Sequence, residues 1–444
     1  MIRLLKGLYF NNRFYLSIVL LVAMFIAGYI VDSVYLIASL SLFGLVIAFL
    51  IEIVILFGIR SPVKASRKAM EKLSNGDENE IILRIESKYP FKVKLNIIDE
   101  APFQFQIRNF GLERQLNKGE SSMISYSLRP TERGEYHFGN INIFVSSQLG
   151  LISRKIIFDA EEMVPVYPSF LQLRKFEFLA ISNKLTEVGI KKIRRLGNTL
   201  EFEHIRNYVV GDDYRALNWK ATARRGEPMV NQYQDEVSQN VYSVIDMGRV
   251  MKMPFNEMTL LDYSINASLV LSSIALLKQD KAGLLTFSKD IKTIVPPKQK
   301  RSHINTINET LYNQLTDFAE SDYETLYTAV RRKIKQRSLI LLFTNFDTLS
   351  GMERNIEYFR AIAKKHLLVV IFFVNTELYE LINSDGDTIK QVYSKTIAEK
   401  LAYEKREIIK KLESNGIHTI YTRPENLTVD TINKYLEIKS RRML

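Results

Sequence analysis

The chain contains no cysteine and only one tryptophan among its 444 residues. The absence of cysteine excludes disulfide frameworks, thiolate zinc sites and cysteine nucleophiles, and it fits a reducing compartment. Histidine is also scarce, and no two of the five histidines have the spacing of metal ligands: His137, His204, His303, His366 and His418. A zinc enzyme is therefore not expected.

Motifs of common catalytic and nucleotide-binding sites are missing as well. The sequence has no GxxxxGK(S/T) and no GxGxxG, so nothing in it predicts binding of ATP or a dinucleotide. It has no GxSxG nucleophile elbow either. We therefore predict no cofactor and no enzymatic activity.

The formal net charge of +12 raises the question of nucleic-acid binding. Eight basic and three acidic residues lie before residue 77, so much of the excess belongs to the N-terminal segment. The rest is spread over the remaining chain, which has no run of five like charges. Binding of nucleic acid is not expected and is kept only as a minor alternative.

Residues 1–60 predict a transmembrane helical hairpin. The segment 14–31 has no charge, and 34–59 is apolar apart from Glu52. A helix of 18 residues reaches about 27 Å, enough to cross most of a bilayer core. Asp32 and Ser33 separate the two segments and suit a helix end and an N-cap. A cleaved signal peptide is disfavoured because no small-residue cleavage site separates the segments.

The positions of lysine and arginine predict the orientation of this hairpin. Three precede the first apolar segment and five follow the second, whereas the turn has none. By the positive-inside rule, the N-terminus and the large C-terminal part are cytoplasmic, at the cell (inner) membrane. Glu52 lies near the cytoplasmic end of its helix, where it can reach water or pair with a neighbour. Residues 61–78 are predicted as a basic juxtamembrane linker containing a short helix that lies near anionic membrane lipid.

Residues 79–166 alternate between apolar and polar side chains, which is typical of half-buried strands. The apolar sets are Phe91, Val93, Leu95 and Ile97; Phe103, Phe105 and Ile107; Ile124, Tyr126 and Leu128; and Ile141, Ile143 and Val145. Glycine turns occur in "NKGE" and "ERGE". The pattern predicts a small β-sandwich that acts as a spacer or docking module.

Residues 240–444 predict a doubly wound α/β domain. Apolar runs ending at Asp246, Ser288, Asn345 and Asn375 indicate buried parallel strands, and amphipathic segments between them indicate helices. Ligands of such sheets bind at the carboxyl ends of the strands. We expect Asp246, Asn345 and Asn375 to meet there.

The segment 167–239 leads into this domain and contains "GDDYRALNWKATARRGEP", residues 211–228. Its most specific spacing is Glu201, Phe202, Arg206, Tyr208, Gly211, Asp212, Arg215, Trp219, Ala223, Arg224 and Glu236. Together with "LRPTERGEYHFGNINIFVSSQLGLISRK" and the order of the domains, it resembles the domain-of-unknown-function family fifty-eight. The resemblance implies a membrane anchor, a von Willebrand factor type A-like fold and a MoxR-type AAA+ ATPase as partner.

The same resemblance implies where a divalent ion would bind. Type A domains hold Mg²⁺ through Asp-x-Ser-x-Ser, a threonine and a second aspartate, whose oxygens suit a hard cation. Here the first motif keeps Asp246 but has Gly248 and Val250 at the serine positions, with Arg249 between them. The threonine position falls on Glu324, with Thr325 one residue away, and the second aspartate position is Asn345. We therefore expect a degenerate site that has lost Mg²⁺ and in which Arg249 can neutralise Asp246. A functioning site and a structural role of Asp246 as a loop acceptor are the alternatives.

The 211–228 segment has two interpretations. As a contact surface it offers residue types enriched at interface hot spots: Tyr214, Arg215, Trp219 and Arg224. As a structural clamp, Asp212 or Asp213 pairs with Arg215, Trp219 packs onto the sheet, and Gly211 and Gly226 form turns. The structural interpretation is favoured for Asp212, Arg215 and Trp219, and both remain open for Lys220, Arg224 and Arg225.

These observations predict a membrane-anchored, cytoplasm-facing scaffold that binds proteins. The expected partners are a MoxR-type AAA+ ATPase, other membrane or von Willebrand type A proteins, and membrane lipid. The alternative is a Mg²⁺-dependent adhesion or substrate-recruiting domain.

Overall fold

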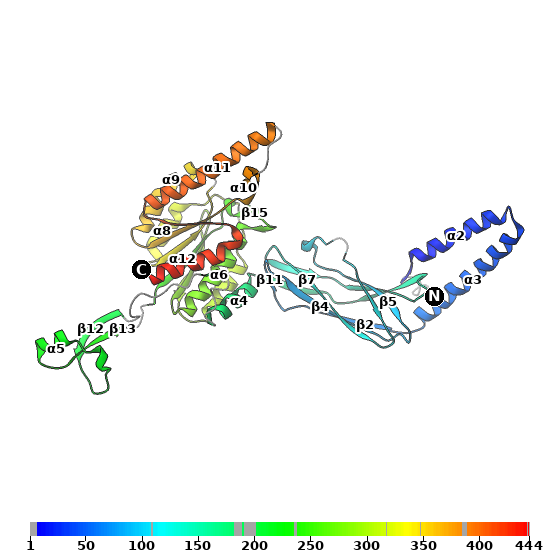
Figure 1. Ribbon diagram of the computed structural model, residues 1–444, viewed down its shortest axis with the longest axis horizontal. Coiled ribbons are helices and arrows are strands. Elements are labelled where there is room, and N and C mark those ends of the chain that lie inside the picture. Colours follow the sequence, from blue (N-terminus) through cyan, green and yellow to red (C-terminus); the bar gives the residue numbers. More distant parts are fainter. Residues whose placement is uncertain are drawn as a thin grey trace. The chain divides into compact units, whose positions relative to one another are not determined.

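The computed structural model divides the chain into two compact units, Met1–Tyr167 and Pro168–Leu444 (Figure 1). It describes residues 7–107, 110–181, 189–190, 201–234, 238–316, 318–346, 348–383, 389–441 and 443. The fold is mixed α/β, as predicted, and each unit is described by itself below.

The first unit begins with two apolar helices, α2 (Asn12–Gly28) and α3 (Asp32–Phe57), which form a hairpin (Figure 1). The helices approach each other closely at Gly28, where a Cβ would lie 2.8 Å from the backbone N of Tyr35. Most of their large apolar side chains are exposed. By length and composition α3 could cross a membrane, and α2 is a shorter apolar helix.

The remainder of the first unit consists of β-strands in three sheets. A five-stranded sheet has the order β1-β10-β9-β5-β6, and two three-stranded sheets have the orders β2-β4-β7 and β3-β11-β8. The strands are β1 (Leu8–Phe10), β2 (Val63–Lys68), β3 (Leu73–Ser74), β4 (Asn79–Ser87), β5 (Val93–Asp99), β6 (Leu112–Leu116), β7 (Ser121–Leu128), β8 (Gly134–Phe138), β9 (Ile141–Ser146), β10 (Ile152–Phe158) and β11 (Glu162–Tyr167).

The predicted alternation places apolar side chains between two of these sheets. Leu83 and Ile85 of β4 share one buried cluster with Leu95 of β5 and Ile143 of β9. The five-stranded sheet and the β2-β4-β7 sheet therefore pack face to face as a sandwich.

Two sequence predictions in this unit are wrong. The expected short helix in 61–78 is absent, because Val63–Lys68 forms β2 and pairs antiparallel with β4. In this strand the Arg67 guanidinium forms a buried ion pair with Asp99, a partner that the local sequence does not reveal. The expected strand around Phe103 and Phe105 is a 3-10 turn, Phe103–Phe105, in which the Phe103 side chain is 84% exposed.

The second unit contains a six-stranded sheet of order β18-β17-β14-β19-β20-β21. All neighbouring strands are parallel except β18, which pairs antiparallel with β17. The strands are β14 (Asn240–Asp246), β17 (Lys281–Phe287), β18 (Ile291–Lys298), β19 (Leu339–Phe343), β20 (Leu367–Phe373) and β21 (His418–Thr422). A short hairpin of β15 (Pro254–Phe255) and β16 (Met258–Thr259) follows β14.

Helices cover both faces of this sheet (Figure 1). One buried cluster joins the sheet to α4 (Phe170–Ile181), α6 (Leu260–Leu277), α7 (His303–Tyr312) and α12 (Leu427–Ser440). The other joins it to α8 (Tyr323–Lys333), α9 (Leu349–Ala363) and α11 (Ile389–Ser414). A short helix, α10 (Thr376–Asn383), precedes α11. Although α6 is apolar enough to resemble a membrane span, 89% of its apolar stretch is buried, so it is a core helix.

Residues 201–234 form a small subdomain, which we call the signature subdomain. Strands β12 (Glu201–Asn207) and β13 (Met229–Gln234) pair antiparallel. Between them lie a 3-10 turn, Tyr214–Ala216, and the helix α5 (Trp219–Arg225).

Candidate functional site

Asp246 lies at the carboxyl end of the central strand β14 and is completely buried. Its Oδ1 accepts hydrogen bonds from the backbone N of Gly248 at 2.8 Å and from Oγ of Ser321 at 2.5 Å. Its Oδ2 accepts from Oγ1 of Thr344 at 2.7 Å and from the Tyr323 hydroxyl at 3.3 Å. Burial raises the pKa of the Asp246 carboxyl. The hydrogen bonds lower this pKa, but their effect is smaller than that of burial, so the pKa lies above its ordinary value. The carboxylate is therefore an acceptor for loop hydroxyls, which was one of the sequence alternatives.

The predicted neutralisation of Asp246 by Arg249 is wrong. The Arg249 side chain is exposed and lies 3.6 Å from Glu320, whereas hydroxyl and amide donors surround the aspartate. A guanidinium is easier to solvate at the surface than to bury, and the hydroxyl groups of Ser321 and Thr344 already satisfy the carboxylate. These donors come from loops far along the chain, so the local motif could not indicate them.

The other residues of the degenerate motif do not form a divalent-cation site. A Cβ at Gly248 would lie 2.1 Å from Oγ of Ser321, so the Ser321 hydroxyl occupies the space that a serine side chain at position 248 would need. Val250 packs against the apolar core. The Thr325 hydroxyl donates to Asp322, the N-cap of α8, at 2.7 Å, and Glu324 is exposed and accepts from the Tyr358 hydroxyl.

The donor set therefore does not fit Mg²⁺, which prefers several convergent oxygen ligands. Within the described ranges, no group of three or more His, Cys, Asp or Glu side chains is placed to hold a metal ion. Asp317 and Asp347 lie outside those ranges.

The expected polar crevice is present only in part. Asn345 and Asn375 line one cavity of about 150 Å³ together with Lys405. Lys405 donates through Nζ to the carbonyl O of Phe346, and Asn375 accepts from the backbone N of Leu378 at 3.2 Å. Asp246 instead contacts the hydroxyl groups described above.

In the signature subdomain, Asp212 pairs with Arg206. The two Asp212 carboxylate oxygens each accept from the guanidinium at 2.7 Å, and Oδ2 also accepts from the backbone N of Val209 at 2.9 Å. The hydrogen bonds from Arg206 hold the pKa of Asp212 below its ordinary value. The predicted pairing of Asp212 or Asp213 with Arg215 lies outside the described residues, because the Arg215 side chain is not described. The pair of Arg206 and Asp212 joins the end of β12 to the turn at Gly211, whose φ of 114° only glycine adopts readily.

Helix α5 is held to β13 by side chains that the sequence analysis did not single out. Asn218 is the N-cap, since its Oδ1 accepts from the backbone N of Ala221 at 3.0 Å, and its Nδ2 donates to Asn231 at 2.7 Å. Thr222 Oγ1 accepts from the backbone N of Met229 at 3.0 Å. The sequence did carry one signal, because an asparagine precedes the helical run and Gly226 follows it as a left-handed C-cap.

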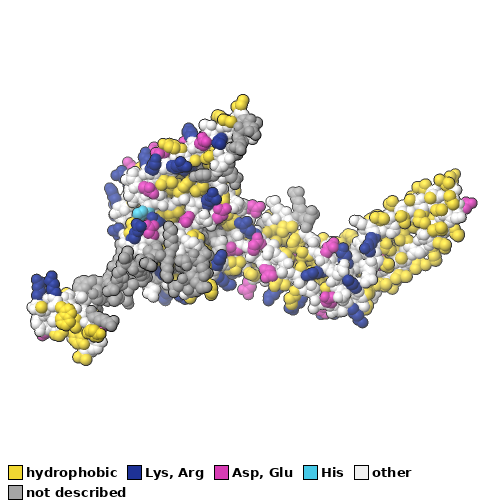
Figure 2. Space-filling model, in the orientation of Figure 1, with side chains coloured by type: hydrophobic (Ala, Val, Ile, Leu, Met, Phe, Trp, Pro, Cys, Tyr) yellow, Lys and Arg dark blue, Asp and Glu magenta, His cyan; other side chains and the backbone are white. Residues whose placement is uncertain are grey.

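The prediction that Trp219 packs onto the sheet is wrong, because its side chain is 73% exposed. Lys220, Arg224 and Arg225 are exposed on the same helix, and lysine and arginine side chains gather over α5 in Figure 2. Large apolar side chains nearby in sequence are exposed too: Tyr208, Val209, Val210 and Tyr214. We call α5 with these residues the α5 surface. Glu236 and the side chains of Glu201 and Arg215 lie outside the described part of the structure.

Comparison with known proteins supports the predicted family. Residues 204–389 match the family model described as "Protein of unknown function DUF58". The uncharacterized protein YeaD of Bacillus subtilis (strain 168) is 25% identical over 267 residues, which is 56% of this chain and 61% of that protein. The uncharacterized protein Rv1480 of Mycobacterium tuberculosis (strain ATCC 25618 / H37Rv) is 24% identical over 188 residues, 42% of this chain and 58% of that protein. The chain thus spans less than two thirds of the length of these relatives.

Among solved structures, this chain is similar to the conserved hypothetical protein BatB from Bacteroides thetaiotaomicron. The match covers 46% of this chain and the whole length of BatB. The sequence identity is 10% and the TM-score 0.29, which is too low to establish a shared fold.

Proposed function

We propose that this chain, which contains the DUF58 segment, is a membrane-anchored scaffold whose second unit binds a protein partner in the cytoplasm. The apolar hairpin α2–α3 is the anchor, and the lysine and arginine residues on both sides of it favour a cytoplasmic location of the two units. The second unit is von Willebrand factor type A-like, a proposal supported by its mainly parallel sheet with helices on both faces.

The exposure of Trp219 beside the basic residues of α5 is the observation that carries this proposal. A large apolar side chain on a soluble surface costs solvation free energy, and tryptophan and arginine are the residues most enriched at interface hot spots. The neighbouring fold does not need the indole, because Asn218 and Thr222 already hold α5 to β13. The exposed α5 surface is therefore accessible to another protein.

The chemistry of the second unit also favours binding over catalysis. Asp246 has the partners of a structural acceptor, and the sequence has no phosphate-binding loop. Any remodelling of a client must therefore draw energy from another protein. A MoxR-type AAA+ ATPase, which the family resemblance implies, is the proposed partner.

Copurification from native membranes tests this proposal. The double variant Arg224→Glu with Arg225→Glu should weaken recovery of the ATPase, and the residual binding should become less dependent on salt, since rim charges act mainly on association. The matched control is Arg331→Glu with Arg332→Glu, an exposed pair in the last turn of α8. Equal loss in both variants, or no ATPase in the unmodified sample, contradicts the proposal.

Trp219→Ala separates a contact role from a structural one. Because the indole is exposed, its removal should leave the melting temperature nearly unchanged but should speed dissociation of the partner. A large loss of stability with unaltered binding would assign the indole to the fold instead.

A further inference from the structure

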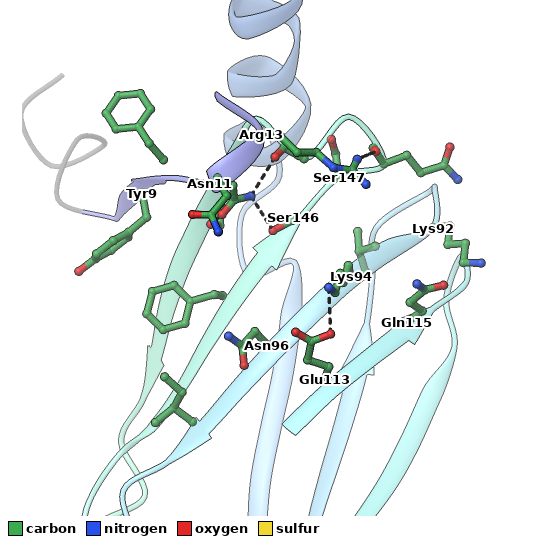
Figure 3. Close-up of a pocket in the computed structure, with 18 residues that line it drawn as sticks. Tyr9, Asn11, Arg13, Lys92, Lys94, Asn96, Glu113, Gln115, Ser146 and Ser147 are labelled. Atoms are coloured by element: carbon green, nitrogen blue, oxygen red, sulfur yellow. Dashed lines mark hydrogen bonds and ion pairs between the residues drawn. The ribbon is translucent and has the colours of Figure 1, made fainter. Parts of the chain in front are cut away.

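A polar cavity of about 790 Å³ lies on the outer face of the five-stranded sheet in the first unit. Figure 3 shows it between the start of α2 and the strands β5, β6 and β9. Its charged lining residues are Arg13, Lys92, Lys94 and Glu113. Three of these four residues are basic, and Oε2 of the one acid, Glu113, lies 2.9 Å from Nζ of Lys94. The cavity therefore has the charge to receive an anion.

The strand register builds the floor of this cavity. Lys94 of β5 pairs with Ser146 of β9 on one side and Gln115 of β6 on the other. Ser146 pairs in turn with Ser153 of β10, which pairs with Tyr9 of β1. Neighbouring strands thus place a row of polar side chains across the sheet, on the face opposite the buried apolar residues of β5.

The cavity is also next to the apolar helices. Arg13, in the first turn of α2, donates through Nη1 to the carbonyl O atoms of Gln148 and Leu149 at 3.1 Å each. The same turn between β9 and β10 is bound to α3, because Glu52 accepts from the backbone N of Leu151 at 3.0 Å. Both helices therefore contact the β9–β10 turn, and residues of this turn, Gln148 and Gly150, also line the cavity.

Aromatic side chains gather at this same junction. Phe10 stacks on Phe14 with ring centroids 4.5 Å apart, and Phe14 lies 5.7 Å from Phe49 of α3. Tyr9 and Phe10 are partly exposed. Aromatic residues beside basic ones are typical of the headgroup layer of a membrane.

We propose that this cavity binds the headgroup of an anionic phospholipid from the membrane in which α2 and α3 are anchored. The phosphate contacts Arg13 and Lys92, and polar headgroup atoms lie over the row of Lys94, Ser146 and Gln115. This inference rests on the proposed membrane anchor, which supplies the lipid at the mouth of the cavity. A bound headgroup would fix the β unit against the membrane surface.

Native mass spectrometry of the full chain, purified from membranes in detergent, tests the site. Phosphatidylglycerol and phosphatidylcholine are titrated separately as probes. The unmodified chain should retain phosphatidylglycerol in preference, and Lys92→Glu with Lys94→Glu should weaken that retention by about tenfold or more, since each basic residue near a lipid surface contributes favourably. Glu113→Gln should strengthen it by removing the acid beside Lys94.

Lys118→Glu is the matched control, because this lysine is exposed in the same unit and does not line the cavity. It should leave retention of phosphatidylglycerol unchanged. Equal retention of both lipids, or the same loss in Lys118→Glu as in the double variant, overturns the proposal. Unchanged melting curves for all variants exclude misfolding as the cause.

Competition with soluble glycerol 3-phosphate distinguishes binding of a lipid from binding of a free phosphate compound. Displacement of phosphatidylglycerol by the soluble compound at equal concentration overturns the assignment to a lipid. Membrane fractionation keeps the two proposals distinguishable. A chain that stays in the membrane but shows no lipid preference contradicts only the cavity, whereas a chain that leaves the membrane at high salt contradicts the anchor itself.

Discussion

Ser147 donates its hydroxyl hydrogen to Oε1 of Glu52 over 2.5 Å, although 95 positions separate them in the sequence. The same carboxylate accepts from the backbone N atoms of Gly150, Leu151 and Ile152 at 3.1, 3.0 and 3.2 Å. Glu52 is completely buried, so an acid within the apolar helix α3 is satisfied by one turn of the β unit. This arrangement fastens the proposed anchor directly to the sandwich.

Glu52→Gln should loosen that connection. The variant replaces one acceptor oxygen by an NH₂ group, which leaves buried backbone donors of the β9–β10 turn without a partner, at a cost of about 1–3 kcal/mol. Hydrogen exchange measured on the full chain should become faster at Leu151 and Ile152. Asp32→Asn, an exposed acid at the other end of α3, should leave their exchange unchanged. Slow exchange in both variants would mean that Glu52 does not hold the turn.

The orientation of the anchor can be tested with single cysteines because the natural chain has none. Ser33→Cys places a thiol in the first turn of α3, at the tip of the hairpin, and Lys118→Cys places one in the β unit. In intact cells, a membrane-impermeant maleimide should label the first and reach the second only after lysis, as the positive-inside rule predicts. Labelling of Lys118→Cys from outside would reverse the topology.

The buried carboxyl of Asp246 should make stability depend on pH. Burial raises the pKa of the Asp246 carboxyl in the folded state above its value in the unfolded state. The protonated carboxyl therefore stabilises the fold fully at pH values below the pKa of the unfolded state, and this stabilisation is lost as the pH rises through the pKa of the folded state. Asp246→Asn removes this titration. The melting temperature of the unmodified chain, relative to the variant, should therefore fall as pH rises from acidic values toward neutral. A constant difference would show that the carboxyl does not titrate there.

Millimolar Mg²⁺ should leave the melting temperature unchanged. A ligand that binds only the folded state raises its stability by mass action, and the oxygen donors around Asp246 are already engaged with each other. A rise that depends on Mg²⁺ and disappears in Asp246→Ala would instead demonstrate a working divalent-cation site. Asp246→Asn serves as the isosteric control.

The main elements could be predicted because their signals are local. Uninterrupted apolar residues indicated α2 and α3, alternation indicated strands such as β5 and β9, and buried apolar runs indicated β14 and β20. Gly211 and Gly226 were predicted at turns, and both have positive φ. Each of these outcomes depends on the order of side chains along a short segment.

The partners of polar and aromatic side chains were decided only by the tertiary structure. Arg67 of β2 forms a buried ion pair with Asp99, and Asp212 pairs with Arg206 of β12. Trp219 was expected to pack onto the sheet but is exposed, and Asn218 and Thr222 hold α5 to β13.

Asp246 illustrates the physical reason. Its position at the end of β14 could be read from the sequence, yet its donors Ser321 and Thr344 lie 75 and 98 residues away. The spacing of apolar residues along a segment shows which side of a helix or strand faces away from water, and this signal lies within the segment itself. A hydrogen bond between residues far apart in the sequence forms only when the packing of the helices and strands brings their loops together. No single segment of the sequence predicts such a contact.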